Sequence, residues 1–181
     1  MRIMTTIGVI LILISCQSCI TTSEVTVPHK GTFPTVTGTN LHGEEQTLPA
    51  CLTKERTIVV VAFERWQQTL CDGWYKHIGA FQKNNKHVGY YEIPTIAKLN
   101  PFVRWFIYRG MRGGIEDDEM RRSVVTLHVD KELFKKGLDI ESEDTVHIYI
   151  MDKDGKLIKY IKGKWTLEKW QEAVAALENK S

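Results

Sequence analysis

The first candidate for chemistry in this sequence is a thiol at the junction between a strand and a helix. Thr57–Phe63 is almost entirely apolar, which predicts a strand buried on both faces. A helical pattern from Gln67 to Asn84 follows, with Cys71 in its first part. Functional groups of such βα units lie where the strand passes into the helix. A cysteine there becomes a nucleophile if the helix N-terminus favours its thiolate. Thiol redox chemistry at Cys71 is therefore the first hypothesis.

The segments that would position Cys71 alternate between strands and helices. Before the central strand, the His42-Gly43 turn between two extended runs predicts a hairpin. The helix after that strand has one apolar stripe, formed by Trp66, Leu70, Trp74, Ile78 and Phe81. The next predicted elements are a strand at His87–Ile93 closed by Pro94, a helix at Pro101–Met111, a strand at Ser123–Val129 and a short helix at Lys131–Leu138. The last are a half-buried strand at Thr145–Met151, an Asp154-Gly155 turn, a strand at Leu157–Ile161, and a helix capped by Thr166 with the stripe Leu167, Trp170, Val174 and Leu177.

The composition limits the classes of function. With 181 residues, of which 43% are hydrophobic, the chain suits one globular domain with a short appendage. Its 24 basic and 22 acidic residues nearly cancel, whereas nucleic-acid-binding proteins are normally more basic. We therefore expect no nucleic-acid partner. Four cysteines are too few for a disulfide scaffold in a chain of this length.

The N-terminus has the features of a bacterial lipoprotein signal. An apolar run at Ile7–Ile14 is too short to span a bilayer and suits a signal peptide. It leads into Leu13-Ile14-Ser15-Cys16, which resembles the lipobox, where a peptidase cuts before the cysteine and the cysteine receives fatty acyl chains such as palmitate. We therefore predict a signal peptide at residues 1–15, lipidation of Cys16 and a tether at residues 16–30. The alternative is an ordinary secretory signal.

The residue after the lipobox cysteine bears on the destination of the protein. It is Gln17 rather than an aspartate. A residue other than aspartate at this position resembles the sorting signal of Gram-negative lipoproteins that are sent to the outer membrane. We therefore expect a protein of the cell envelope, held on the outer membrane by its lipid anchor and facing the periplasm.

The order of elements resembles the thioredoxin fold in its redoxin form. The segment Phe33-Pro34-x-x-x-Gly38-Thr39-x-Leu41-x-Gly43-x-x-x-Thr47-Leu48 is similar to the leading hairpin of that group. Three later segments are similar to the thioredoxin-like family that includes the mitochondrial ATP synthase assembly factor: Arg109-Gly110-Met111-Arg112-x-Gly114-Ile115, Asp139–Thr145 and Ile148-Tyr149-Ile150-Met151-Asp152-x-x-Gly155-x-Leu157. The resemblance implies an α/β domain over residues 31–178, with a central mixed sheet flanked by helices and an N-terminal β-hairpin.

Measured against that fold, the predicted redox site lacks two of its parts. Thioredoxin-type enzymes carry C-x-x-C at the start of the helix, and aligning Phe63 with the end of the family's strand places Gln68 at the attacking position and Cys71 at the resolving one. The enzymes also place a cis-proline before the last long strand, and Asp144 occupies that position here. A non-proline cis bond is costly, so we expect a trans peptide there. The proline and threonine or serine pattern of peroxiredoxins is also missing before Cys71.

The two cysteines of the predicted domain are expected to remain unpaired. Cys51 precedes the central strand and Cys71 follows it, and a strand of this length spans roughly 23 Å, at about 3.3 Å per residue. A disulfide needs Cα atoms within about 7 Å. Cys71 is then either a small buried hydrophobe or a single reactive thiol, and the second alternative includes a disulfide with another molecule.

A second candidate surface lies on the predicted helix from Pro101 to Arg112. On a helical wheel, Trp105 falls among Arg104, Arg109 and Arg112 on the outward side. A tryptophan among arginines suits an anionic lipid surface or a protein partner. The alternative is cation–π packing that only covers the helix.

The sequence predicts no metal and no cofactor. Its six histidines have no metal-type spacing, and the C-x-x-x-C pair of copper-delivery proteins of this fold is missing. Asp152-x-Asp154-Gly155 resembles a calcium loop, but its glycine comes too early and no later glutamate fits, so it is interpreted as a turn.

The leading hypothesis is a membrane-anchored, redox-inactive thioredoxin-fold lipoprotein that acts as a binding or assembly module for a protein partner. Its expected contact surfaces are the Trp105 helix and the junction at Glu64–Gln68, in particular Trp66 and Gln68. The alternative hypothesis is an enzyme, a monothiol oxidoreductase or peroxiredoxin-like protein that uses Cys71. A third hypothesis is a carrier of a small ligand in the groove left by the missing proline.

Overall fold

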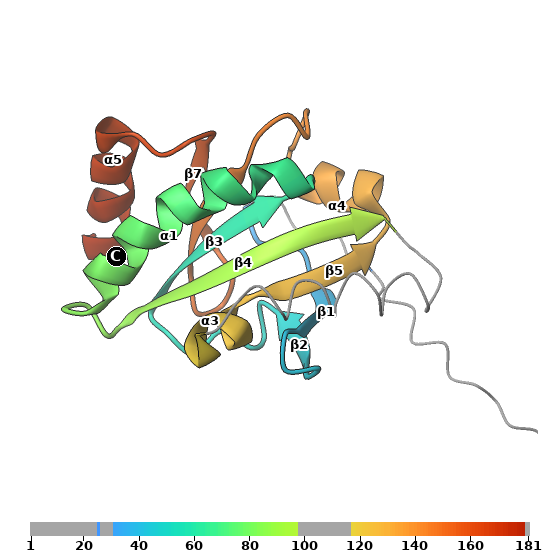
Figure 1. Cartoon of the computed structure of the whole chain (residues 1–181), viewed down its shortest axis with the longest axis horizontal. Coiled ribbons are helices and arrows are strands. Elements are labelled where there is room, and N and C mark those ends of the chain that lie inside the picture. The colour runs from blue at the N-terminus through green and yellow to red at the C-terminus, as the bar shows by residue number, and fades with distance from the viewer. Residues whose placement is uncertain (1–24, 26–30, 98–116, 180–181) are drawn as a thin grey trace, which may run out of the picture.

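The computed structural model describes residue 25 and the ranges 31–97 and 117–179, which Figure 1 shows in colour. Several predictions concern residues outside these ranges. They are the signal peptide, the lipidated Cys16 and the helix that carries Trp105, Arg104, Arg109 and Arg112. Val25 falls within the predicted tether, and its side chain packs against the core.

The described strands form one seven-stranded mixed sheet in the order β2-β1-β5-β4-β3-β6-β7. The central strand β3 runs parallel to β4 on one side and antiparallel to β6 on the other. The bounds are β1 (Val36–Asn40), β2 (Glu45–Leu48), β3 (Arg56–Ala62), β4 (Val88–Ala97), β5 (Val125–Val129), β6 (His147–Asp152) and β7 (Leu157–Lys162). The predicted α/β fold, with a mixed sheet and a leading hairpin, is confirmed.

Helices cover both faces of this sheet, as Figure 1 shows. Successive residues of β3 point to opposite faces, so Ile58 and Val60 join one apolar cluster while Val59 and Val61 join the other. The first cluster is covered by α1 (Gln68–Gln82), α3 (Asp118–Ser123) and α5 (Leu167–Glu178), and the second by α4 (Lys131–Gly137). The prediction of a central strand buried on both faces is confirmed. None of the described helices is long and apolar enough to cross a bilayer.

Two strand predictions on the β4 side of the sheet are wrong in their bounds. Strand β4 does not close at Pro94 but continues to Ala97. Pro94 lies opposite the last residue of β3, where the loss of a backbone donor is tolerated, and β4 then pairs with β5 from Thr95. Ser123 is the last residue of α3, and β5 begins only at Val125. Asp117 caps the start of this helix by accepting a bond from Met120 N at 2.7 Å.

Strand β6 was predicted to be half-buried, but both of its faces are buried. It lies between β3 and β7 in the sheet, with an apolar cluster on each side. His147 and Tyr149 are therefore buried although they alternate with aliphatic residues. The alternation of aliphatic residues with His147 and Tyr149 therefore marks a difference in side-chain polarity and not a difference in exposure.

The ends of the two long helices differ from the predicted apolar stripes. A 3-10 turn, η1 (Arg65–Gln67), precedes α1, so Trp66 lies outside the helix and is 56% exposed. Leu167 is the first residue of α5 and is 57% exposed, and Ala173 takes a buried position instead. Thr166 caps α5 as predicted, accepting a bond from Lys169 N at 3.3 Å.

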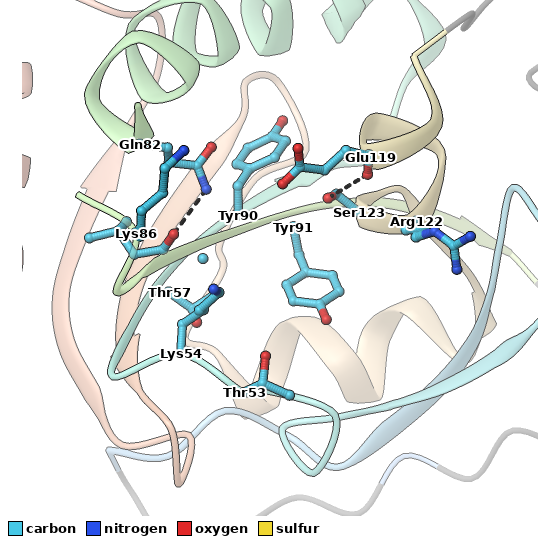
Figure 2. A pocket seen from close by; sticks show the side chains of 12 residues that line it. Thr53, Lys54, Thr57, Gln82, Lys86, Tyr90, Tyr91, Glu119, Arg122 and Ser123 are labelled. Carbon is cyan, nitrogen blue, oxygen red and sulfur yellow. Dashed lines mark hydrogen bonds between the residues drawn. The ribbon is translucent and has the colours of Figure 1, made fainter. Parts of the chain in front are cut away.

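The sheet has a gap between the first half of β4 and its neighbour. Strand β5 pairs with β4 only from Thr95 onward, apart from an isolated bridge between Glu92 and Val124. Helix α3 lies beside the unpaired part of β4. The space left there is a pocket, seen from close by in Figure 2.

Candidate functional site

The candidate site begins with a buried amide at the end of β3. The Gln67 side chain is fully buried, and its Oε1 accepts bonds from Phe63 N at 2.8 Å and from Glu64 N at 3.3 Å. Its Nε2 donates to the carbonyl oxygen of Glu143 at 2.6 Å. Gln67 therefore ties the junction after β3 to the loop before β6, so these two loops face each other.

The facing loop has no cis-proline. The one cis peptide bond of the described residues joins Leu48 to Pro49, so the bond before Asp144 is trans, as predicted. Asp144 is exposed, its backbone N–H donates to Ser142 Oγ at 3.1 Å, and its carboxylate is 3.9 Å from Lys162 Nζ. The loop is thus held by its own turn and by a surface ion pair.

Ion pairs also fix the facing loop to α4. Glu143 pairs with Lys131 and, at 3.1 Å, with Lys135. Partial burial tends to raise the pKa of Glu143, but hydrogen bonds from the two lysines outweigh it and the pKa is lowered. The Lys131 ammonium also lies 5.5 Å from the centre of the Phe63 ring. Both sides of the junction are therefore anchored to the same helix.

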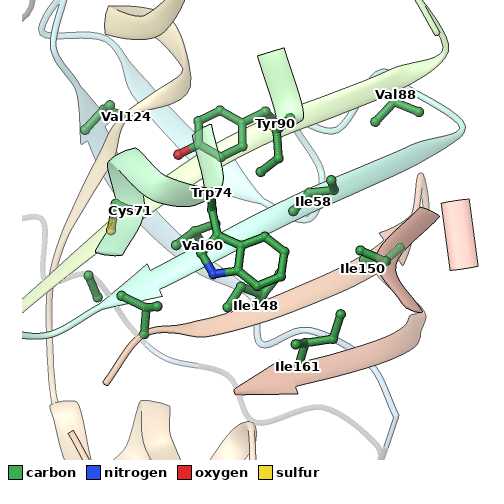
Figure 3. Packing of buried hydrophobic residues seen from close by; sticks show 14 of the residues in the cluster. Ile58, Val60, Cys71, Trp74, Val88, Tyr90, Val124, Ile148, Ile150 and Ile161 are labelled. Atoms are coloured by element: carbon green, nitrogen blue, oxygen red, sulfur yellow. The ribbon is translucent and has the colours of Figure 1, made fainter. Parts of the chain in front are cut away.

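The Cys71 thiol is fully buried on the inner side of α1, as Figure 3 shows. Burial raises the pKa of Cys71 strongly, and the carboxylates of Glu92 and Asp72 raise it further. A shielded, protonated thiol is the state of a structural cysteine and not of an attacking one. The position predicted for Cys71 is therefore confirmed, and its environment favours the interpretation as a buried hydrophobe.

The residue at the attacking position, Gln68, lies on the surface at the start of α1. Its Nε2 donates to Asp72 Oδ1 at 3.1 Å. Trp66 lies close to Gln68 in the chain and is also exposed. Thr69 Oγ1 donates to the Trp66 carbonyl at 3.3 Å. The structure therefore brings together the predicted residues of the junction.

A buried carboxyl group lies below this surface, and the sequence analysis did not identify it. Glu92 in β4 is 2% exposed, and the Tyr90 hydroxyl donates to its Oε2 at 3.1 Å. Burial raises the pKa of Glu92 to about 7, opposed by hydrogen bonds from Tyr90 and Gln68. The available signal was a single acidic residue inside an otherwise uncharged strand.

The imidazole of His147 near the site is already engaged in polar contacts. His147 is buried, with Nδ1 2.8 Å from the Tyr160 hydroxyl and Nε2 2.9 Å from the Ser142 carbonyl oxygen. Burial lowers the pKa of His147. Cys51 and Cys71 are both free thiols. Within the described ranges, no three histidine, cysteine or acidic side chains are grouped to hold a metal ion.

Replacing Gln67 by alanine is expected to lower the free energy of unfolding by about 2 kcal/mol, because buried backbone groups of Phe63 and Glu143 would lose their partner. Urea denaturation of the two proteins measures the difference. Gln171→Ala is a matched control, since Gln171 is an exposed glutamine of α5, and its effect should stay within about 0.5 kcal/mol. Equal losses in both variants would show that Gln67 does not link the loops.

Comparison with solved structures identifies the fold. The thioredoxin domain of a thiol-disulfide oxidoreductase from Bacteroides vulgatus is 16% identical, with a TM-score of 0.54 over 85% of this chain and 100% of that chain. BsSco, described as a member of the Sco family of cytochrome c oxidase assembly proteins, is 13% identical, with a TM-score of 0.55 over 84% of this chain and 97% of that one. At these identities the likeness shows the fold alone, which is thioredoxin-like.

Comparison with protein families is more specific. No curated protein matches the chain. The family model described as ATP10 protein matches residues 29–161, which is more than half of the chain and includes the whole junction described above. The predicted relation to the ATP synthase assembly factor family is thereby confirmed. The chain has a thioredoxin-like fold and belongs to the ATP10 protein family.

Proposed function

We propose that this protein is a non-catalytic binding or assembly module of the cell envelope. The observation that carries the proposal is the state of the two positions that dithiol enzymes use. Gln68 stands exposed at the attacking position, and Cys71 is buried and protonated at the resolving one. Asp144 at the cis-proline position, with the Glu143 carbonyl already bonded by Gln67, supports the same conclusion.

The contact surface proposed for the partner is the junction around Trp66. A tryptophan that is 56% exposed beside Gln68 offers a large apolar side chain with polar neighbours, which is the composition of energetically important interface residues. The proposed second part of this surface is Trp105 with Arg104, Arg109 and Arg112, on residues outside the described ranges. The partner is proposed to be a protein that is itself in or on the membrane.

The membrane attachment is proposed to run through acyl chains on Cys16, after removal of residues 1–15. It is supported by the Leu13-Ile14-Ser15-Cys16 sequence and by Gln17 after it. Two acyl chains give a lasting anchor, whereas one chain binds only marginally. We expect the wild type to incorporate labelled palmitate and to be recovered with the outer-membrane fraction. We expect Cys16→Ser to incorporate no label. Palmitate retained in Cys16→Ser would refute the assignment.

The function is tested by crosslinking and pull-down of the lipidated protein from its own membranes. Trp66→Ala is expected to reduce partner recovery at least fivefold, while Cys71→Ser leaves it unchanged. Leu167→Ala is the matched control, because Leu167 is equally exposed but lies on α5. Maleimide trapping in the same sample should leave Cys71 unlabelled until the protein is unfolded. Rapid native labelling of Cys71 together with loss of recovery in Cys71→Ser would favour the monothiol enzyme.

A further inference from the structure

A second candidate site lies at the gap in the sheet, away from the junction. Figure 2 shows the pocket beside the first half of β4. Its cavity volume is about 180 Å³, enough for several water molecules or a small ligand. The segment before β3, the end of α1 with the loop after it, the start of β4 and helix α3 all contribute to its lining.

The charge of the lining is positive. Lys54, Lys86 and Arg122 line the pocket against a single carboxylate, that of Glu119. Arg122 shares its charge with Asp118 at 3.4 Å and Glu44 at 4.0 Å. Lys54 and Lys86 make no ion pair within the described ranges. Two ammonium groups are therefore available to an anion.

The floor of the pocket holds a buried hydroxyl group without a partner. Thr57 is 1% exposed, and its Oγ1 makes no hydrogen bond. A Cβ atom added at Gly89 would lie 3.0 Å from Thr57 Oγ1 and 3.1 Å from Lys54 Cγ, so the glycine keeps the space between these two side chains open. Buried hydroxyl groups are normally hydrogen-bonded, so the unpartnered hydroxyl of Thr57 in the pocket lining is a donor for a polar group that binds there.

The other polar groups of the lining are partly engaged. Gln82 Nε2 donates to the Val88 carbonyl at 3.0 Å, and Ser123 Oγ donates to the Glu119 carbonyl at 3.0 Å. Burial raises the pKa of Tyr91, and the neighbouring Cys51 thiol raises it further. The lining donors without a partner in the described ranges are thus the two lysines and the hydroxyl groups of Thr53 and Thr57, which is a set suited to an anion rather than to a cation.

We propose that this pocket binds a phosphate group, as inorganic phosphate or as a phosphomonoester. Lysine ammonium groups bind phosphate as point charges, and a hydroxyl group adds a short bond to a charged oxygen. Glu119, the carboxylate of the lining, can accept a bond from a hydroxyl group of a phosphomonoester. The site does not use the junction residues, so it is independent of the proposed function.

The test is an isothermal calorimetric titration of the full chain with inorganic phosphate at constant ionic strength. Saturable binding in the wild type and at least tenfold weaker binding in the Lys54→Gln/Lys86→Gln double variant are expected. Lys153→Gln, an exposed lysine in the β6–β7 turn, is the control and should bind as the wild type does. Equal affinity in the double variant and the control, or equal binding of chloride, would overturn the proposal.

Two further measurements address the buried hydroxyl and the source of the phosphate. Thr57→Val should leave the melting temperature unchanged or raised, because the hydroxyl group has no partner, yet weaken phosphate binding several-fold. Vesicles of phosphatidylcholine with phosphatidic acid present the same phosphomonoester as a lipid headgroup. Binding to these vesicles, lost in the double variant, together with no binding of free phosphate would assign the site to a headgroup. No variant-sensitive binding of either probe would refute it.

Discussion

Glu92→Gln is expected to become more stable than the wild type as the pH rises, by up to about 3 kcal/mol between pH 4.5 and pH 8. The folded protein raises the pKa of Glu92 to about 7 from an ordinary value of 4.5, because the carboxyl group is buried. Between these pH values the folded state keeps a proton that the unfolded state releases. The free energy of unfolding of the wild type therefore falls as the pH rises through this window, and below it the penalty is absent.

The comparison with the variant isolates Glu92 from other titrating groups. Burial lowers the pKa of His147, which gives the opposite slope: its contribution is lost as the pH falls through the unfolded value of 6.5. That slope is common to both proteins and cancels in the difference. The amide that replaces the carboxyl group can still accept the bond from the Tyr90 hydroxyl, so the packing is preserved.

Urea denaturation at half-unit steps from pH 4.5 to pH 8 measures the difference. Glu55→Gln is the control, because Glu55 is an exposed glutamate at the start of the central strand, and its difference from the wild type should be flat. A flat difference for Glu92→Gln as well would show that Glu92 is ionised in the folded protein. Glu92 raises the pKa of Cys71 through its carboxylate charge, so the same result would also mean that this charge favours the protonated thiol throughout the window.

The elements nearest Cys71 were predictable because their signals are local. The apolar run of β3, the turn at Gly43 and the Thr166 cap each depend on a few neighbouring residues. Gly43 has the positive φ that its hairpin turn requires. Cys71 lies with Trp74 and Ile78 on the buried side of α1, a position that the predicted apolar stripe did not include.

The functional groups that sequence reasoning missed depend on contacts between distant segments. Gln67 is buried because its amide reaches Glu143, which is 76 residues further along the chain. Glu92 is buried because α1 covers that part of β4. Thr57 is buried next to Gly89, its partner across the β3–β4 pair. A glutamine and a glutamate at such positions are normally predicted to be surface residues from the sequence alone, whereas Thr57 was predicted to lie in a buried strand and only its missing partner was not foreseen.

The exposed tryptophan shows the converse case. Helical spacing placed Trp66 in the buried stripe with Trp74, although the junction was also predicted to be a contact surface. The 3-10 turn rotates Trp66 out of that stripe and leaves it 56% exposed, while Trp74 stays in the core and donates to the Gly163 carbonyl at 3.0 Å. A change of helix type over three residues is therefore enough to convert a core position into a surface one.

Gln68→Cys is expected to form a disulfide with Cys71 in air-oxidised protein, where the wild type forms none. The two positions are three residues apart at the start of α1, and side chains at that spacing lie on the same side of a helix, about 5–6 Å apart at Cβ. A disulfide tolerates Cα separations of about 4.4–6.8 Å. The new thiol would stand at the exposed N-terminus of α1, which favours its thiolate and thus attack on an oxidant.

Peptide mapping by mass spectrometry, with and without reduction, measures this bond. Thr69→Cys is the matched control, because residues two apart on a helix do not face each other, and it should give little or no bond to Cys71. Equal yields in the two variants would mean that α1 opens enough to expose Cys71, against the buried thiol on which the proposed function rests.

The restored dithiol is expected to remain a poor oxidoreductase, with insulin reduction no more than a few-fold above the wild type. Gln67 already bonds the Glu143 carbonyl, and Asp144 holds a trans peptide where the enzymes have their cis-proline. The Glu143 carbonyl and the Asp144 N–H of the facing loop are therefore already bonded and do not serve to align a substrate chain. Rapid insulin reduction by Gln68→Cys alone would show that one thiol was the only missing part, and that the facing loop does not limit activity.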